Sequence, residues 1–361
     1  EKHTITTGFE FKNISMKTFQ KIQDINYLDH NNNVNIFGVF LQDKWKVSPI
    51  LSLQTGLRIS RYNGHEKNYY DPRIGMKYLL TDNSALKASW GIYNQFLFTH
   101  NNEEEIINFV NVWGMVPEHL DAQTAQHFIA GYEQRFNQDY FASIEAYYKP
   151  YSNLIVNNPN NNPAIKDDDF IEGQGEAWGI ELLLKKSSGK LTGWIGYSYS
   201  KLRRRVDFNN DGQIKEADDE VYNPKYDQPH SINCVLSYRL NQKNSFGLTI
   251  KAASGQPYTP VVGKTFSQSN MGDYLNPYSE LRNIVGDRNS ARYPTYFRSD
   301  ISWTRDIYPF DLEGKFKFQI INFTNHFNTL FYYWRHDRSP SEVLAISMFP
   351  IIPSIGFEFK I

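Results

Sequence analysis

A run of oxygen-bearing side chains between residues 207 and 218 is the part of the sequence best suited to chemistry. Asp207, Asn209 and Asp211 are spaced two apart, a glycine follows, and Asp218 ends a stretch of twelve residues. EF-hand calcium loops place oxygen ligands at positions one, three and five, a glycine at six, a backbone carbonyl at seven and an acid at twelve. The spacing therefore predicts a Ca²⁺ site formed by Asp207, Asn209, Asp211, the carbonyl of Gln213, and Asp218.

This segment departs from an EF-hand in three respects. Lys215 stands at position nine, where an ammonium cannot bind a cation, so a water molecule would have to fill that place. Asp218 replaces the usual glutamate, and the flanking segments are predicted strands where an EF-hand has helices. The expected affinity is in the weak range of extracellular calcium modules. The alternative is an external segment rich in Asn, Asp and Gly that binds no metal.

Asp227 and His230 are spaced three apart, which suggests a catalytic dyad. They also stand on either side of Pro229 at the entry to a predicted strand, where they could order the base of a connection. No Gly-x-Ser-x-Gly turn accompanies them, and that turn is what presents the nucleophile in many hydrolases. We therefore favour the structural role for both residues.

The elements that must position these residues are strands, because most of the chain shows a two-residue alternation. The apolar positions of one such segment are Ile232, Cys234, Leu236, Tyr238 and Leu240. The same pattern recurs at 51–60, 178–185, 246–252 and 315–320. The longer apolar faces extend over about ten residues, which is the length that a tilted strand needs to cross a hydrocarbon core. Strands of soluble sandwiches usually have about 5–6 residues.

The opposite faces of these strands carry Lys, Arg, Glu, Gln and Asn, which a closed soluble core would not bury. A transmembrane β-barrel accommodates both faces, because apolar side chains face lipid and polar side chains face a wet lumen. This interpretation predicts that Ile232, Leu236, Phe316 and Phe318 are not buried between two stacked sheets.

The connections support an antiparallel meander, because short and long segments alternate. Short joints with turn residues occur at 48–49, 81–83, 137–139, 188–189 and 241–243, with a looser one at 306–312. Long segments fall at 13–33, 62–69, 99–122, 151–174, 203–228, 255–294 and 324–353. Outer-membrane barrels have short periplasmic turns and long extracellular loops. About fourteen strands result, and the last ends in the alternating Ile355, Phe357, Phe359 and Ile361.

The amino-acid composition excludes several other classes of protein. The 361 residues carry 38 Lys and Arg against 39 Asp and Glu, which excludes a strongly basic nucleic-acid binder. The aromatic content of 16% argues against a disordered chain. The mean hydropathy of −0.57 and the lack of a long apolar run exclude transmembrane helices. A single cysteine, Cys234, excludes an intrachain disulfide framework.

Several phrases, in this order along the chain, resemble those of TonB-dependent receptors of the outer membrane, in the form common among Bacteroidetes-like bacteria. They are Phe40-Leu41-Gln42-Asp43-Lys44-Trp45, Leu53-Gln54-Thr55-Gly56-Leu57-Arg58, Tyr70-Asp71-Pro72-Arg73-Ile74-Gly75, Ala177-Trp178-Gly179-Ile180-Glu181, Tyr197-Ser198-Tyr199-Ser200, Tyr226-Asp227-Gln228-Pro229-His230-Ser231-Ile232-Asn233, Ser254-Gly255-Gln256-Pro257-Tyr258-Thr259 and Ile320-Ile321-Asn322-Phe323-Thr324-Asn325. The resemblance covers nearly the whole chain.

The resemblance implies a 22-stranded barrel that is plugged by an N-terminal domain and imports scarce nutrients with energy delivered through TonB. With about 14 of the 22 strands, residues 1–361 are expected to be the C-terminal portion of the barrel, without the plug domain and the first strands. The expected partners are outer-membrane lipid and lipopolysaccharide, the plug domain, the TonB complex, and a siderophore, vitamin, glycan or peptide, but not nucleic acid. No cofactor is required in this interpretation, with Ca²⁺ possible in the external segment.

The function predicted from the sequence is therefore that of a transporter in the cell outer membrane of a Gram-negative bacterium, not an enzyme. Two alternatives remain open. An outer-membrane barrel enzyme of the protease or lipase type would need a clustered site such as Asp227 and His230. A soluble extracellular glycan-binding all-β protein would purify without detergent.

Two further groups of residues belong to the predicted external segments. Arg203, Arg204 and Arg205 form a charge cluster for which lipopolysaccharide phosphates are a plausible partner. Aromatic residues, among them Trp113, Tyr332 and Trp334, could stack on a ligand or pack the segments against one another.

Overall fold

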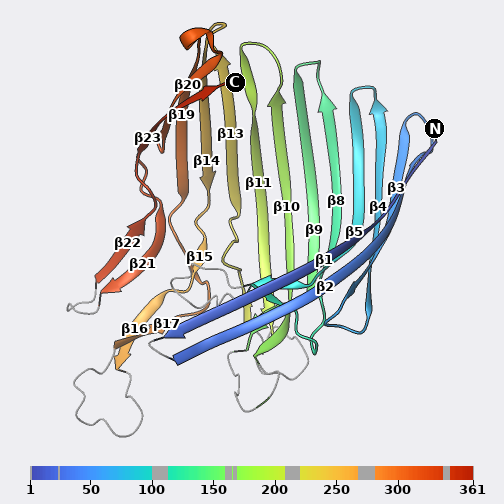
Figure 1. Ribbon diagram of the computed structural model, residues 1–361, viewed down its shortest axis with the longest axis vertical. Coiled ribbons are helices and arrows are strands. Elements are labelled where there is room, and N and C mark those ends of the chain that lie inside the picture. Colours follow the sequence, from blue (N-terminus) through green and yellow to red (C-terminus); the bar gives the residue numbers. More distant parts are fainter. Residues whose placement is uncertain are drawn as a thin grey trace. The chain divides into compact units, whose positions relative to one another are not determined.

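The computed structural model describes residues 2–22, 25–99, 113–158, 165, 169–207, 220–266, 281–335 and 342–360. Its main sheet contains 15 strands, of which β12 (Glu220–Tyr222) pairs with β11 beside the path of the others. The strands of the path follow one another in chain order (Figure 1). They are β1 (His3–Ile22), β2 (Ile25–Lys46), β3 (Leu51–Tyr62), β4 (Asn68–Thr81), β5 (Ser84–Gln95), β8 (Gln123–Arg135), β9 (Tyr140–Asn157), β10 (Phe170–Lys186), β11 (Leu191–Val206), β13 (His230–Arg239), β14 (Asn244–Ala253), β19 (Tyr296–Ile307), β20 (Gly314–Ile321) and β23 (Ile352–Phe359). This order is the predicted meander of about fourteen strands.

The chain divides into two compact units. Unit 1 comprises residues 1–102, 108–182 and 201–221, and unit 2 comprises residues 103–107, 183–200 and 222–361. Among the described residues, the helical structure is a short 3₁₀ turn at Pro309–Asp311, and no helix is long and apolar enough to cross a membrane.

Strand register in unit 2 aligns the apolar positions of six strands into one row. Because partners across an antiparallel ladder lie on the same face of a sheet, each row has one chemical character. One row consists of Leu191, Tyr238, Phe246, Trp303, Phe318 and Ile355. The adjacent row, on the other face, consists of Thr192, Ser237, Gly247, Ser302, Gln319 and Ser354. The predicted two-sided sheet is therefore confirmed strand by strand.

Unit 1 shows the same separation. Trp45, Leu53, Met76, Ala88, Ala130 and Ala146 are register partners on one face. The neighbouring row on the other face consists of Lys46, Ser52, Lys77, Lys87, Gly131 and Glu145.

No second layer covers the apolar face among the residues that the structure describes. Ile232 is 42% exposed, and Leu236, Phe316 and Phe318 are half-buried, so none of the four is enclosed between sheets. A soluble domain would pack a second layer onto such a face. The prediction that these four side chains are not core residues is therefore confirmed.

Several of the predicted long connections contain strands in the structure. The segment 13–33 was expected to be a long connection, but β1 and β2 continue as one ladder through it, with Thr18 opposite His30. Lys, Gln, Asp and Asn residues interrupt the apolar alternation in this segment, which is why the alternation did not reveal this ladder. Three of the other long segments, 99–122, 255–294 and 324–353, carry small two-stranded sheets, formed by β6 (Leu97–Thr99) with β7 (Trp113–Met115), β15 (Pro257–Tyr258) with β18 (Ala291–Arg292), β16 (Val261–Phe266) with β17 (Leu281–Val285), and β21 (Thr329–Arg335) with β22 (Glu342–Ser347).

The short joints are built as predicted. Asn137 Oδ1 accepts hydrogen bonds from the backbone N–H groups of Asp139 and Tyr140, and Asn241 Oδ1 accepts them from Lys243 and Asn244. These side chains replace backbone partners that a tight turn cannot supply. The small sheets of the long segments, such as β21 with β22, lie at the opposite ends of the strands (Figure 1).

Candidate functional site

The polar face of unit 1 carries charges that neutralise one another across strands. Glu133 on β8 pairs with Lys77 on β4, 2.6 Å between Oε1 and Nζ, and also with Lys87 on β5. Near the other end of the same face, Glu10 on β1 pairs with Arg58 on β3. Paired charges on a half-exposed wall suit a water-filled or protein-filled interior and would be costly against lipid.

A second group on this face combines a guanidinium with aromatic rings. The guanidinium carbon of Arg73 lies 4.5 Å from the centroid of Tyr93, and the Tyr93 and His127 rings are 4.4 Å apart. Asp71, which is buried, accepts a 2.7 Å hydrogen bond from Asn94 Nδ2. Arg73, Tyr93 and His127 lie on the polar face of β4, β5 and β8, near the ends that lead to the long segments.

An apolar cluster lies at the long-segment ends of the unit 1 strands. Its buried members are Val34, Ile36, Tyr62, Tyr69, Phe96, Met115 and Ala122. The rings of Tyr62 and Phe96 stack at 5.3 Å, and Tyr69 meets Phe96 edge-on at 5.0 Å. Met115 and Ala122 belong to the connection between β5 and β8, so the cluster holds that connection against the strands.

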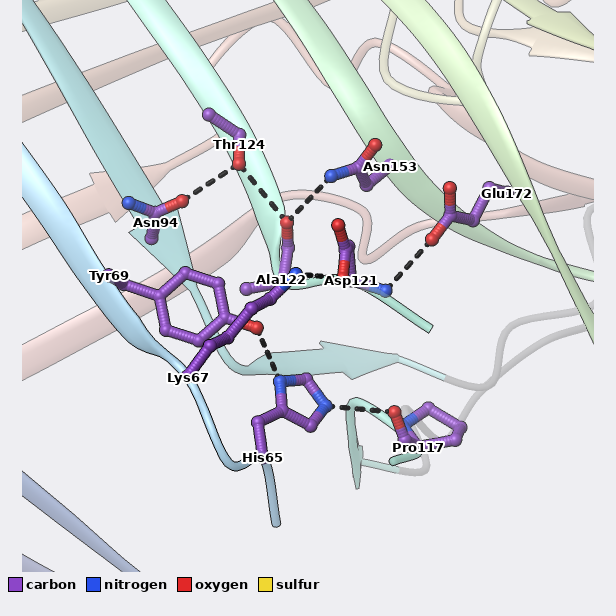
Figure 2. A network of polar contacts seen from close by, with 10 residues as sticks. All are labelled: His65, Lys67, Tyr69, Asn94, Pro117, Asp121, Ala122, Thr124, Asn153 and Glu172. Carbon is purple, nitrogen blue, oxygen red and sulfur yellow. Dashed lines mark hydrogen bonds and ion pairs between the residues drawn. The ribbon is translucent and has the colours of Figure 1, made fainter. Parts of the chain in front are cut away.

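His65 fastens the same connection through hydrogen bonds (Figure 2). Its Nε2 lies 2.9 Å from the carbonyl oxygen of Pro117, and its Nδ1 contacts the hydroxyl of Tyr69. A carbonyl only accepts, so Nε2–H is the donor, and Nδ1 of the neutral ring then accepts from the Tyr69 hydroxyl. The Tyr62 hydroxyl also donates to the carbonyl of Val116, at 3.2 Å. Two consecutive carbonyls of one connection are therefore bound by the turn between β3 and β4.

A third set of contacts joins the end of this connection to β9 and β10 (Figure 2). Lys67 pairs with Asp121, whose carboxylate raises the pKa of the Lys67 ammonium. The backbone N–H of Asp121 donates to Glu172 Oε1 at 2.8 Å, and Asn153 Nδ2 donates to the carbonyl of Ala122 at 3.3 Å. The described part of this connection is thus held from both sides and forms a fixed surface at the strand ends.

In unit 2 the corresponding ends are joined around a buried carboxylate. Asp227 is 2% exposed and pairs with Arg292 through Oδ2 and Nη2. Arg292 Nη1 also donates to the carbonyl oxygens of Asp227, at 2.7 Å, and Gly255, at 3.2 Å. Gly255 is required here, because a Cβ at this position would lie 1.6 Å from the Tyr293 carbonyl oxygen.

Two further contacts complete this junction. Asn289, buried and in the left-handed conformation at φ 50°, donates from its backbone N–H to Thr259 Oγ1 and from Nδ2 to the carbonyl of Asn223. Asparagine tolerates this conformation better than most residues. Three segments that are distant in sequence, around 223–228, 255–259 and 288–293, are therefore connected at one place.

Three tyrosines pack together beside this junction. The rings of Tyr258 and Tyr293 stack at 4.4 Å, and each lies 5.3 Å from Tyr332. Burial, followed by the neighbouring tyrosines, raises the pKa of Tyr293 to about 12. For Tyr332, the structure thus favours packing of the segments over direct stacking on a ligand.

The structure does not bring Asp227 and His230 together as a dyad. The Asp227 carboxylate pairs with Arg292, while His230 Nδ1 lies 2.9 Å from the Tyr197 hydroxyl and its ring is 5.1 Å from that of Tyr199. The structural role predicted for both residues agrees with these contacts.

The predicted calcium segment lies mostly outside the described residues. Asp207 is described and is buried at the end of β11. Asn209, Asp211, Gln213 and Asp218 lie outside the described residues. Among the residues that the structure describes, no group of three or more His, Cys, Asp or Glu side chains is arranged to hold a metal ion. Binding of Ca²⁺ by the 207–218 segment stays a prediction.

Sequence reasoning did not find the hydrogen bonds of His65 with Tyr69 and Pro117. It also did not find the contacts of Arg292 with Asp227 and Gly255. His65 and Arg292 have unremarkable neighbours in sequence, and their partners are 52 and 65 residues away. Only the turn residues around them, such as Pro117 and Gly255, indicated ordered connections.

Comparisons with known proteins were made for the whole chain. The family model described as TonB dependent receptor-like, beta-barrel, matches residues 2–339. A search of curated proteins found no match. The ferric citrate transporter FecA in its unliganded form is similar with a TM-score of 0.64 at 14% identity, over 99% of this chain and 51% of that chain.

Two other solved structures show the same likeness. The ferripyoverdine receptor of the outer membrane of Pseudomonas aeruginosa has a TM-score of 0.58 at 13% identity, over 91% of this chain and 42% of that chain. The FrpB iron transporter from Neisseria meningitidis has a TM-score of 0.58 at 13% identity, over 99% of this chain and 52% of that chain.

The chain spans about half the length of these structures, and at such identities the likeness shows the fold alone. The family follows from the match over residues 2–339. On that match, the chain belongs to the TonB-dependent receptor-like β-barrel family.

Proposed function

We propose that this chain forms part of an outer-membrane receptor that takes up a scarce nutrient with energy supplied through TonB. The observation that carries the proposal is the two-sided sheet of a TonB-dependent receptor-like family member, with apolar rows on one face and paired charges on the other. The apolar rows would face lipid, and the charged wall would face the interior through which a ligand passes.

The long-segment ends would provide the external binding surface. In unit 1 the connection from β5 to β8 is fixed by His65 and Tyr62, and in unit 2 three segments are fixed by Arg292. Pre-ordered segments lose less conformational entropy when a ligand binds, which favours tight capture of a dilute nutrient. Ligand passage would then depend on a plug domain and the TonB complex, which we propose as partners.

The ligand class is proposed to be a ferric chelate, a vitamin, a glycan or a peptide. Three of the similar solved structures are a ferric citrate transporter, a ferripyoverdine receptor and an iron transporter, so ferric chelates are tested first. The placement of the chain in the outer membrane of a Gram-negative bacterium belongs to the same proposal.

The membrane placement is tested by cysteine labelling of the intact receptor in native membranes. In a Cys234→Ser background, Ile232→Cys stands on the apolar face and Asn233→Cys on the polar face of β13. We expect a lipid-soluble maleimide to label position 232 and a small water-soluble maleimide to label position 233. Labelling of both positions by the water-soluble reagent alone, or recovery of the protein without detergent, would favour a soluble glycan-binding protein.

Transport is tested by deleting the gene that encodes the receptor. Uptake of ⁵⁵Fe-citrate, of ⁵⁵Fe-loaded siderophores, of cyanocobalamin and of labelled oligosaccharides and peptides is then compared with the parent and with a strain lacking TonB. We expect one ligand class to lose uptake equally in both mutant strains. Normal uptake of every class, with turnover of an ester or peptide substrate that Asp227→Asn abolishes, would favour a barrel enzyme.

A further inference from the structure

The end of β11 carries four basic residues, Lys201, Arg203, Arg204 and Arg205. Because side chains alternate along a strand, they are divided between the two faces of the sheet. Lys201 Nζ lies 6.0 Å from the ring centroid of Trp178 on β10, so these two side chains share a face. Gly175 is three residues from Trp178 on β10, so it lies on the opposite face of the strand. A Cβ at Gly175 would lie 3.8 Å from Arg204 Cγ. Arg204 is therefore on the other face. Because side chains alternate along a strand, Arg203 lies on the same face as Lys201.

This face of β10 and β11 is the apolar one. Trp178, Ile180, Leu182 and Leu184 alternate along β10 and are each 39–49% exposed. On β11 the same face runs from Leu191 to Tyr199, which is nine residues, and Lys201 comes next. A tilted strand crosses the hydrocarbon core in about 9–11 residues. Lys201 and Arg203 therefore lie just beyond the end of the hydrocarbon core, on the side of the sheet from which the long segments extend.

Aromatic rings mark this level on the neighbouring strands of unit 1. Phe128 on β8 and Tyr148 on β9 stack at 6.4 Å, and the Tyr148 hydroxyl lies 3.3 Å from Glu176 Oε2 on β10. Phe128 is 42% exposed, Tyr148 is 44% exposed and Trp178 is 39% exposed. Exposed aromatic rings at this height are typical of the boundary between the hydrocarbon core and the headgroups.

The two cations have free charge at that boundary. Lys201 and Arg203 are exposed, and the described residues include no ion pair of either. Glu176, the carboxylate on the same face of β10 as Trp178, accepts a hydrogen bond from the Tyr148 hydroxyl. By contrast, Lys77 and Lys87 on the polar face share Glu133. An arginine fork and an ammonium spaced two residues apart on one strand complement a phosphate, which accepts several charge-assisted hydrogen bonds.

We propose that Lys201 and Arg203, beside Trp178, bind a phosphate of the phosphorylated glycolipid that forms the outer leaflet, lipopolysaccharide. The inference rests on the proposed membrane placement of the receptor. Charge complementarity selects an anionic headgroup, and the position at the long-segment end selects the outer leaflet. The acyl chains of the same molecule would lie along Trp178, Ile180 and Leu182 below the cations.

The test uses the intact receptor purified in detergent, with bisphosphorylated lipid A as the probe and native mass spectrometry as the readout. The variant is Lys201→Gln/Arg203→Gln. The matched control is Lys190→Gln/Arg239→Gln, an exposed Lys and Arg that are joined by a backbone hydrogen bond at the short-turn end. Each cation near an anionic lipid surface contributes about a fivefold change in affinity, so we expect about 25-fold weaker binding for the variant and no change for the control.

Two further probes define the ligand. Dephosphorylated lipid A should bind the parent and the variant equally weakly, because the cations then have no phosphate to contact. Phosphatidylglycerol should bind the parent at least about tenfold more weakly than lipid A. Equal binding of both lipids would overturn the assignment to lipopolysaccharide.

The remaining outcomes are also decisive. Unchanged lipid A binding in the variant, or an equal loss in the control, would overturn the site. Recovery of every variant and of the parent without detergent would overturn the membrane placement itself, and so separates failure of the proposed function from failure of this site. Heat-modified migration on gels establishes that each variant is folded before lipid is added.

Discussion

Arg292 covers the buried carboxylate of Asp227 and also binds two backbone carbonyls with one of its nitrogens. The carbonyls belong to Asp227, at 2.7 Å, and to Gly255, at 3.2 Å. One guanidinium thereby joins β18 to the turn before β13 and to the end of β14. A long connection held in this way keeps its shape without a disulfide, which this chain with its single cysteine cannot form internally.

Replacing Arg292 should loosen this junction, because it leaves the Asp227 carboxylate buried without its guanidinium partner. Breaking a fully buried pair costs about 3–5 kcal/mol; Arg292 is one-third exposed, so we expect about 2 kcal/mol for Arg292→Met. Urea unfolding measures this loss of stability, and limited proteolysis of the 255–259 segment measures the loosening of the junction. As a control, Lys317→Met removes an exposed pair with Glu358 and should have no measurable effect. Equal effects of the two changes would contradict the role of Arg292.

Tyr69→Phe should weaken the connection between β5 and β8, because His65 Nδ1 then loses its donor inside the apolar cluster. An unsatisfied buried acceptor costs about 1–3 kcal/mol. We expect faster proteolysis at residues 117–121 and a lower urea midpoint. Tyr70→Phe is the matched control, since Tyr70 is adjacent and 55% exposed. If Tyr70→Phe has the same effect, the His65 hydrogen bond does not hold the connection.

Tyr293 should ionise far above an ordinary tyrosine, because burial raises its pKa to about 12. The ordinary value of about 10 applies in the unfolded chain. Stability from this group is therefore fully present below pH 10 and is lost as the pH rises from 10 to 12, since the unfolded chain then binds fewer protons. The absorbance difference at 295 nm between the parent and Tyr293→Phe should titrate near pH 12. A midpoint near pH 10 would show that Tyr293 is not enclosed by Tyr258 and Tyr332.

The 207–218 segment should bind Ca²⁺ weakly, with a dissociation constant of about 10⁻⁴–10⁻³ M. Calorimetric titration of the intact receptor with CaCl₂ measures this affinity, and Asp207→Ala/Asp211→Ala should abolish the heat. Because Asp207 is buried, Asp211→Asn/Asp218→Asn is a second variant that leaves the end of β11 unchanged. Heat from the parent that does not exceed that of these variants would remove the calcium site.

The two-residue alternation was enough to predict the strands and their two faces. Ile232 proved to be exposed and Leu236 half-buried, so neither is enclosed between sheets, as expected, because a residue's face in a strand depends on its position alone. The alternation did not predict the continuation of β1 and β2 through 13–33, because polar residues there interrupt the apolar period. Backbone pairing, which depends on the neighbouring strand, decided that ladder.

The sequence by itself thus determined the strand order, the family and the character of each face. Only the tertiary structure decided which side chains meet at the strand ends. Asp227 pairs with Arg292 rather than with His230, and His65 binds Pro117 and Tyr69. The reason is physical: alternation is a local property of the backbone, whereas a buried charge or hydrogen bond is satisfied by whatever partner the folded connections bring within reach.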